Sequence, residues 1–181
     1  NKNSFSTLTI KDSTQSGSTY KTQTGVVINV GTSSAVKESG TTITLNNVQV
    51  GAINAYYTTS CTVNVNGSEA GAIALSGTSG GAVNVGSSVL SGKAASVNIT
   101  PTGASTGGRV TATNATITGG VTLSGVGATL TGTNSHVNAV TLFGSNGTDT
   151  ATGKDLTDSQ KSSLAAPSVT LNGGTATTIS S

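Results

Sequence analysis

The residue types that carry most enzyme chemistry are scarce in this chain, which has one histidine, His136, and one cysteine, Cys61. A Ser-His-Asp apparatus would have to use His136, but the nearest acid in the sequence is Asp149 and no Gly-x-Ser-x-Gly turn stands near it. Zinc sites need three or four ligands, mostly His and Cys. The six acids are too scattered for the paired carboxylates of a glycosidase. We therefore predict that the protein is not an enzyme and has no cofactor.

Three carboxylates stand close together late in the sequence, at Asp149, Asp155 and Asp158. Carboxylate oxygens, together with backbone carbonyls, are the ligands that Ca²⁺ prefers, so these three residues are the candidates for a calcium site. Their spacing matches no EF-hand loop. A solvated loop that leads into the N-terminus of a helix accounts for the same acids equally well, and both interpretations stay open.

Two Asn-x-Ser/Thr sequons contain a glycine that favours a turn, Asn66-Gly67-Ser68 and Asn146-Gly147-Thr148. Glycosylation of such a sequon attaches a bulky, solubilising sugar at the surface. Asn66 and Asn146 are therefore the glycosylation candidates. A chain this rich in Asn and Thr also produces sequons by chance, so the unmodified state is the alternative.

The composition excludes several classes of partner. The net charge is only +2, and the chain has two Phe, three Tyr and no Trp, so it lacks both the basic patch and the stacking aromatics of a nucleic-acid-binding protein. No stretch approaches the 18 or so apolar residues of a membrane-spanning helix. Most charged residues lie in 1–38 or 149–161, which leaves a long middle section almost without charge.

We expect an exported protein. The chain begins at Asn1 and contains no Met, a pattern typical of a mature chain whose signal segment has been removed. Cys61 has no partner for an internal disulfide, and it opens the alternating stretch 61–65, so we predict that it is a small buried side chain. The predicted location is extracellular or at the cell surface.

Short stretches rich in β-branched residues, bounded by Gly, Ser or Asn, run through most of the chain and predict an all-β fold. One short helix is predicted over 156–166, because Thr157 and Gln160 have the spacing of a capping box and Pro167 ends the helix. The predicted strands are 6–10, 25–30, 41–50, 53–57, 61–65, 72–75, 82–85, 96–99, 109–117, 121–123, 128–130, 137–143, 169–171 and 177–179.

The pattern favours a β-solenoid, formed by residues 1–181 as one domain. In a β-solenoid, three short strands make a rung of roughly 20 residues, and stacked rungs cover one another's apolar faces. A narrow interior also explains the scarcity of aromatic residues. The spacing of the apolar pairs drifts, however, so an antiparallel β-sandwich or jelly roll is the alternative. The residues predicted to be buried are Val63, Val65, Ile73, Leu75, Val83, Val85, Val97, Ile99, Val121, Leu123, Leu130, Val140 and Leu142.

The stretch 108–143, GRVTATNATITGGVTLSGVGATLTGTNSHVNAVTLF, resembles the rungs of secreted bacterial haemagglutinin-type adhesins. Those proteins are similar in being rich in Thr, Asn and Gly, poor in Cys and low in charge. The resemblance covers about a fifth of the chain and implies a right-handed β-helix at a cell surface. It transfers no functional residue.

The predicted function is that of a structural subunit that assembles with copies of itself into an extracellular filament or surface layer. Unpaired strand edges invite another chain, and residues 1–10 are predicted as a strand between subunits. Phe5, Leu8 and Ile10 are its assembly residues, because alone they bury too little to offset the backbone entropy of ordering.

The alternative function is that of an adhesin module that binds carbohydrate or a host surface, for which Tyr56-Tyr57 is the one aromatic cluster. A third interpretation, a crystal-binding solenoid, needs threonine ranks on a flat face. The Thr-x-Thr pairs at 111/113, 116/118 and 129/131 do not recur at one fixed period, which argues against it.

Overall fold

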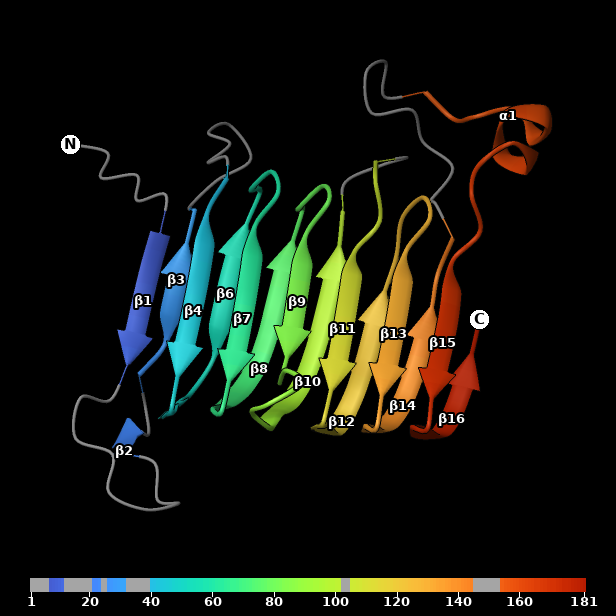
Figure 1. The fold of residues 1–181 in the computed structure, drawn as a ribbon. Helices are drawn as coiled ribbons and strands as arrows, with labels where there is room; N and C mark the ends of the chain where they lie inside the picture. Colours follow the sequence, from blue (N-terminus) through green and yellow to red (C-terminus); the bar gives the residue numbers. More distant parts are fainter. Residues whose placement is uncertain (1–6, 12–20, 24–25, 32–39, 102–104, 145–153) are drawn as a thin grey trace.

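Parallel strands stack side by side in the computed structural model, which describes residues 7–11, 21–23, 26–31, 40–101, 105–144 and 154–181 (Figure 1). The first sheet contains, in spatial order, β1 (Thr7–Lys11), β4 (Thr42–Asn46), β7 (Thr62–Asn66), β9 (Ala82–Val85), β11 (Arg109–Thr113), β13 (Thr129–Thr133) and β15 (Ser168–Asn172). The second sheet contains β2 (Lys21–Gln23), β3 (Ile28–Val30), β5 (Val48–Val50), β6 (Ile53–Tyr56), β8 (Glu69–Ser76), β10 (Gly92–Thr100), β12 (Ala115–Leu123), β14 (His136–Leu142) and β16 (Thr175–Ser180).

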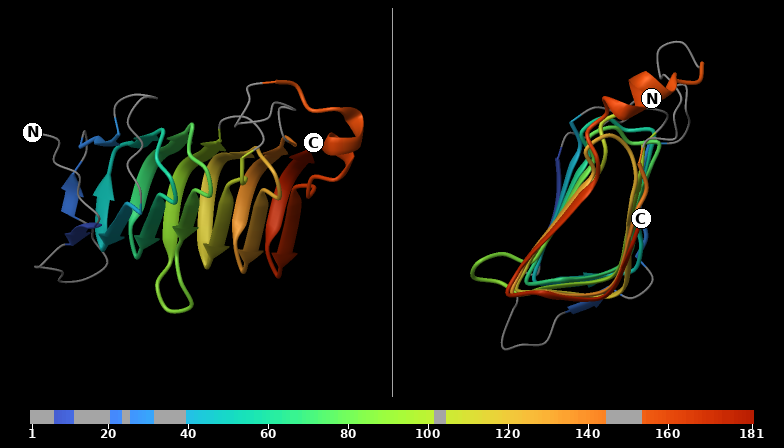
Figure 2. Two further views of the ribbon diagram at one scale, coloured as in Figure 1. Left: turned by 90° about the horizontal axis from the view of Figure 1, so that it is seen from above. Right: turned by 90° about the vertical axis from the view of Figure 1, so that its right-hand side faces the viewer.

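Each turn of the chain forms one rung, which runs along a strand of the first sheet, rounds a corner and returns along the second sheet. Seen along the stack, the rungs superimpose on a roughly triangular outline (Figure 2). In several pairs of neighbouring rungs, equivalent residues are 20 positions apart, as with Asn64 and Asn84 or Ala115 and Ser135. Every described strand pair is parallel. The β-solenoid prediction is therefore confirmed, and the antiparallel sandwich is wrong.

Insertions explain why the period drifts along the sequence. Asn114 lies against Ser87, 27 positions earlier, and Thr175 lies against His136, 39 positions earlier. The extra residues leave the stack as the loop 87–91 and as a longer segment that carries α1 (Asp158–Ser162), both visible in Figure 2. The strands on either side of each insertion still pair in register. The stack is thus more regular in space than in sequence.

The interior is a set of apolar columns that run along the stack. One column of the first sheet contains Val63, Val83 and Val110, each directly beside the next. The second sheet supplies columns such as Ile73 and Val97. All thirteen residues predicted to be buried are buried. Because side chains alternate between the two faces of a strand, the intervening Thr and Asn residues point outward.

The corner after the first sheet depends on residues that accept a positive φ. Asn47, Asn114 and Asn134 have φ values of 55°, 49° and 48°, and Gly67 and Gly173 take the same place in two other rungs. Only Gly and, less readily, Asn visit this left-handed region at small cost. The prediction of continuous strands over 41–50 and 109–117 is therefore wrong in one respect: each is broken at its asparagine, where the chain turns the corner.

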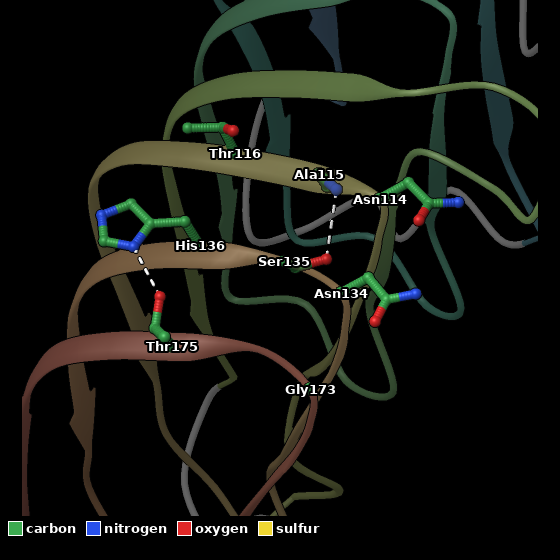
Figure 3. A pocket seen from close by; sticks show the side chains of 8 residues that line it. All are labelled: Asn114, Ala115, Thr116, Asn134, Ser135, His136, Gly173 and Thr175. Atoms are coloured by element: carbon green, nitrogen blue, oxygen red, sulfur yellow. Dashed lines mark hydrogen bonds between the residues drawn. The ribbon is translucent and has the colours of Figure 1, made fainter.

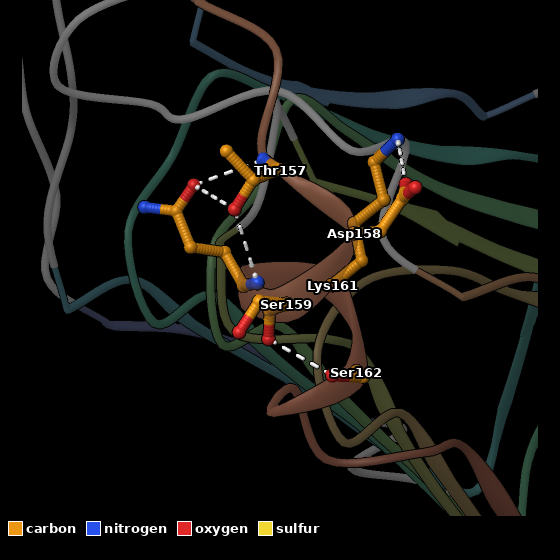
Figure 4. Close-up of polar contacts among 6 residues, drawn as sticks. Thr157, Asp158, Ser159, Lys161 and Ser162 are labelled. Atoms are coloured by element: carbon orange, nitrogen blue, oxygen red, sulfur yellow. Dashed lines mark hydrogen bonds and ion pairs between the residues drawn. The ribbon is translucent and has the colours of Figure 1, made fainter.

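The predicted helix is present as α1, and its capping box is formed (Figure 4). The Thr157 side chain accepts a hydrogen bond from the Gln160 backbone N–H, and Gln160 Oε1 accepts one from the Thr157 N–H at 2.9 Å. Asp158 and Lys161 form an exposed ion pair at 3.9 Å. The helix ends at Ser162, earlier than predicted, and buries none of its residues. It belongs to an insertion outside the stack and adds nothing to the apolar interior.

We expect Val83→Asp to lower the free energy of unfolding by about 3 kcal/mol or more, because the substitution places a charge in a fully buried apolar column. Urea denaturation followed by circular dichroism measures the change. Thr111→Asp, which introduces the same carboxylate on the outer face of β11, is the control and should cost about 1 kcal/mol or less. Equal losses from the two variants would contradict the assignment of inner and outer positions.

Candidate functional site

His136 lies at the rim of an open groove of about 510 Å³ beside the corner of the last rungs (Figure 3). Asn114, Asn134 and Gly173 line the groove from the corner, and Thr116 and Thr175 line it from the second sheet. The His136 ring nitrogen Nδ1 makes a 2.8 Å hydrogen bond with the Thr175 hydroxyl. The chemistry that these side chains offer is hydrogen bonding by hydroxyl, amide and imidazole groups.

Ser135, at the floor of this groove, has a structural role. Its hydroxyl accepts a hydrogen bond from the Ala115 backbone N–H at 3.1 Å and donates one to the Thr133 carbonyl at 2.8 Å. Ser68 does the same in an earlier rung, where it bonds the Val48 N–H. A buried backbone donor without a partner is costly. These serines therefore satisfy backbone groups that the sharp corner withdraws from the sheet.

We expect Ser135→Ala to destabilise the protein by about 1–3 kcal/mol, because it leaves the buried Ala115 N–H without its acceptor. Thermal or urea unfolding measures the loss. Ser88→Ala, the same substitution in the exposed loop 87–91, should stay within about 0.5 kcal/mol of the parent. If the two variants were equally stable, the corner serine would have no such role.

The calcium and glycosylation candidates that the structure describes, Asp155, Asp158 and Asn66, do not line this groove. Asp149 and Asn146 fall outside the described residues. Asp155 and Asp158 are exposed, and the described ranges contain no group of three or more His, Cys, Asp or Glu side chains that could hold a metal ion. The Asn66 amide lies on the outer face of the first sheet and donates a 3.3 Å hydrogen bond to Asn46, so a glycan at Asn66 would displace that contact.

Cys61 is fully buried, which matches its predicted place inside the stack. Burial raises the pKa of its thiol to about 11, and a hydrogen bond with Thr58 offsets only part of this effect. The thiolate is the nucleophile. Cys61 is unreactive because its thiol stays protonated near neutral pH and because reagents cannot reach the buried sulfur.

A disulfide reagent such as Ellman's reagent should therefore leave Cys61 unmodified in the folded protein at pH 8 and modify it fully in denaturant. The chain has one cysteine, so absorbance at the end of the reaction counts modified molecules directly. Rapid modification of the folded protein would contradict the burial of Cys61.

The outer face of the first sheet carries ranks of Thr and Asn. An amide ladder crosses three strands, from Asn84 to Asn64 at 2.8 Å and from Asn64 to the Thr44 hydroxyl at 3.2 Å. Farther along, Thr111 lies beside Thr131. The Thr-x-Thr pairs themselves are not aligned, because Thr129 lies beside Arg109 and the pair 116/118 lies in β12 of the second sheet.

The loop 87–91 interrupts this face. It follows β9 and projects away from the stack at a corner (Figure 2), and its residue Val89 is 84% exposed. The Ser87 hydroxyl accepts from the Leu90 N–H, and the Asn114 amide donates to the Ser87 carbonyl, so the loop is held at the corner. A flat crystalline surface cannot contact the whole face past this loop.

The tyrosine pair does not form one aromatic cluster. Tyr56 is 38% exposed, whereas the Tyr57 ring lies against Gly77 of the next rung, where an added Cβ would meet it at 2.5 Å. Phe143 is also exposed but lies at the far end of the same sheet. Among the described residues, the exposed aromatic side chains therefore stand singly and do not form a binding platform.

Both ends of the stack leave apolar interior positions partly uncovered. At one end, Leu8 and Ile10 of β1 are only partly buried against the core, while Phe5 lies outside the described residues. At the other end, Ile179 of β16 is 55% exposed although Val140, its neighbour in the stack, is fully buried. Within the described chain, β1 and β15 have a paired strand on one side only.

The stacked parallel rungs define the chain as a β-solenoid protein. No family model matches it, and no curated protein or solved structure was found to be similar. The resemblance of residues 108–143 to haemagglutinin-type adhesins therefore stays a prediction. Within the described ranges, the chain holds no helix with the length and apolar character to cross a membrane.

Proposed function

We propose that the protein is a structural subunit that stacks end to end with copies of itself into an extracellular filament. The observation that carries this proposal is the exposure of interior positions at the end of the stack. Ile179 continues a column whose other members, including Val121 and Val140, are almost entirely buried. A further rung would cover it as each rung covers its neighbour.

The strand edges at the two ends support the same proposal. An unpaired edge presents a row of backbone donors and acceptors, and another strand satisfies them. Here the edges of both sheets lie at the ends of the stack. Pairing them would add backbone hydrogen bonds at the same time as it buries apolar surface, and both effects favour association.

The arrangement of the two edges favours a filament over a closed dimer. The edges face opposite ways along the stack, as Figure 1 shows for β1 and β15. Contact between unlike surfaces is heterologous, and it continues as an open fibre when the operation that relates the subunits does not close.

We expect the purified chain to form filaments that negative-stain microscopy and sedimentation detect, and Ile179→Lys to abolish them. Ile179 is half exposed in the single subunit, so lysine is tolerated there, but a neighbouring rung would bury its charge. Thr178→Lys adds the same charge at an exposed outward position and should still assemble. A parent chain that stays monomeric at high concentration, or an Ile179→Lys variant that assembles normally, would overturn the proposal.

The outer face of the first sheet favours a second candidate, an adhesin module that binds cell-surface carbohydrate with the side of the stack. Its outward-facing hydroxyl and amide groups, such as those of Thr111 and Asn84, are suited to hydrogen bonding with sugar hydroxyls. A monomeric parent chain in the assembly experiment, combined with retention on immobilised glycans, would favour this function over the filament.

A further inference from the structure

We infer that β15 of one subunit pairs in parallel and in register with β1 of the next, so that Thr170 lies beside Thr9. This inference rests on the proposed function, and it specifies which strands meet and in which register. The partner is a second copy of this chain. The contact repeats the geometry that already joins neighbouring rungs within one subunit.

In the first sheet, the two end strands match each other in length, direction and burial pattern. β1 and β15 are the two end strands of this sheet, each has five residues, and both run in the same direction because every pair between them is parallel. Their burial patterns are the same, with partly buried residues at the second and fourth positions. In-register pairing would place Val169 over Leu8 and Leu171 over Ile10, which extends the two interior columns.

The second sheet is compatible with the same register. Ile28 pairs with Ile53, and Ile53 with Ile73, so Ile28 begins the column that ends at Ile179. Ile179 would therefore lie over Ile28 of the next subunit. Ile179 is 55% exposed and would gain an apolar neighbour there, whereas Ile28 is only 7% exposed in the single subunit, so most of the newly buried apolar surface of this column would come from Ile179.

Outward positions add no repulsion at this register. Ser168 would lie beside Thr7, Thr170 beside Thr9, and Asn172 beside Lys11, so that the one charged side chain of β1 faces a neutral amide. Like charges directly opposite one another in a sheet are destabilising. A slip by one residue would instead bring the inward-facing Val169 and Leu171 beside outward-facing residues of β1, because side chains alternate between faces.

Disulfide trapping in the full-length chain tests the register. Neighbouring strands lie about 4.8 Å apart, and a disulfide needs Cα atoms within about 7 Å. The variant Thr9→Cys with Thr170→Cys should therefore cross-link between subunits and give a ladder of covalent multimers on a non-reducing gel. Thr7→Cys with Thr170→Cys is the matched control, because two residues of offset separate its Cα atoms by about 8 Å. Cys61 is buried and does not compete.

Microscopy of the same samples separates the two claims. Filaments with a ladder only in the in-register variant support the inference. Filaments without a ladder, or with a ladder in the offset control, overturn this register and leave end-to-end assembly standing. If neither the variants nor the parent form filaments, no cross-link can form. That outcome overturns the proposed function and the inference with it.

Discussion

Backbone hydrogen bonds between successive rungs are the interaction on which the rest of the structure depends. They hold each strand beside the equivalent strand of the next rung. Val63 therefore lies beside Val83, and Asn64 lies beside Asn84. A slip of one residue would turn every apolar side chain outward. The corner residues that accept a positive φ, such as Asn114 and Asn134, fix where each strand stops and so keep successive rungs in phase.

This register determines which residues the interior tolerates. Because the interior is narrow, some of its positions have no room for any side chain. A Cβ added at Gly108 would lie 2.6 Å from the Ile99 side chain, and one at Gly132 would lie 2.7 Å from Leu171. The same narrowness accounts for a core of Val, Ile, Leu and Ala without tryptophan. Inserted segments that the narrow interior cannot hold, such as the one that carries α1, leave the stack at a corner.

The sequence predicts the fold class and the buried positions because alternation is a local property, readable in stretches such as 62–65. It does not predict which strands are neighbours. Val63 and Ile73 stand ten positions apart and look like successive members of one column, yet they lie in different sheets, and the true repeat joins Val63 to Val83. Nor does it predict that Asn47 breaks a strand, since asparagine accepts extended and left-handed backbone alike. The half-exposed Ile179 follows only from its place in the last rung.

The central claim is that rungs pair in parallel with a repeat of 20 residues. Nuclear Overhauser contacts in the isotopically labelled protein test it most directly. If assembly broadens the spectrum, the Ile179→Lys variant replaces the parent chain. The account predicts contacts of the parallel type between the backbone protons of Val63 and Val83 and between those of Val110 and Leu130. Antiparallel contacts between strands adjacent in sequence, such as β7 and β8, would contradict it.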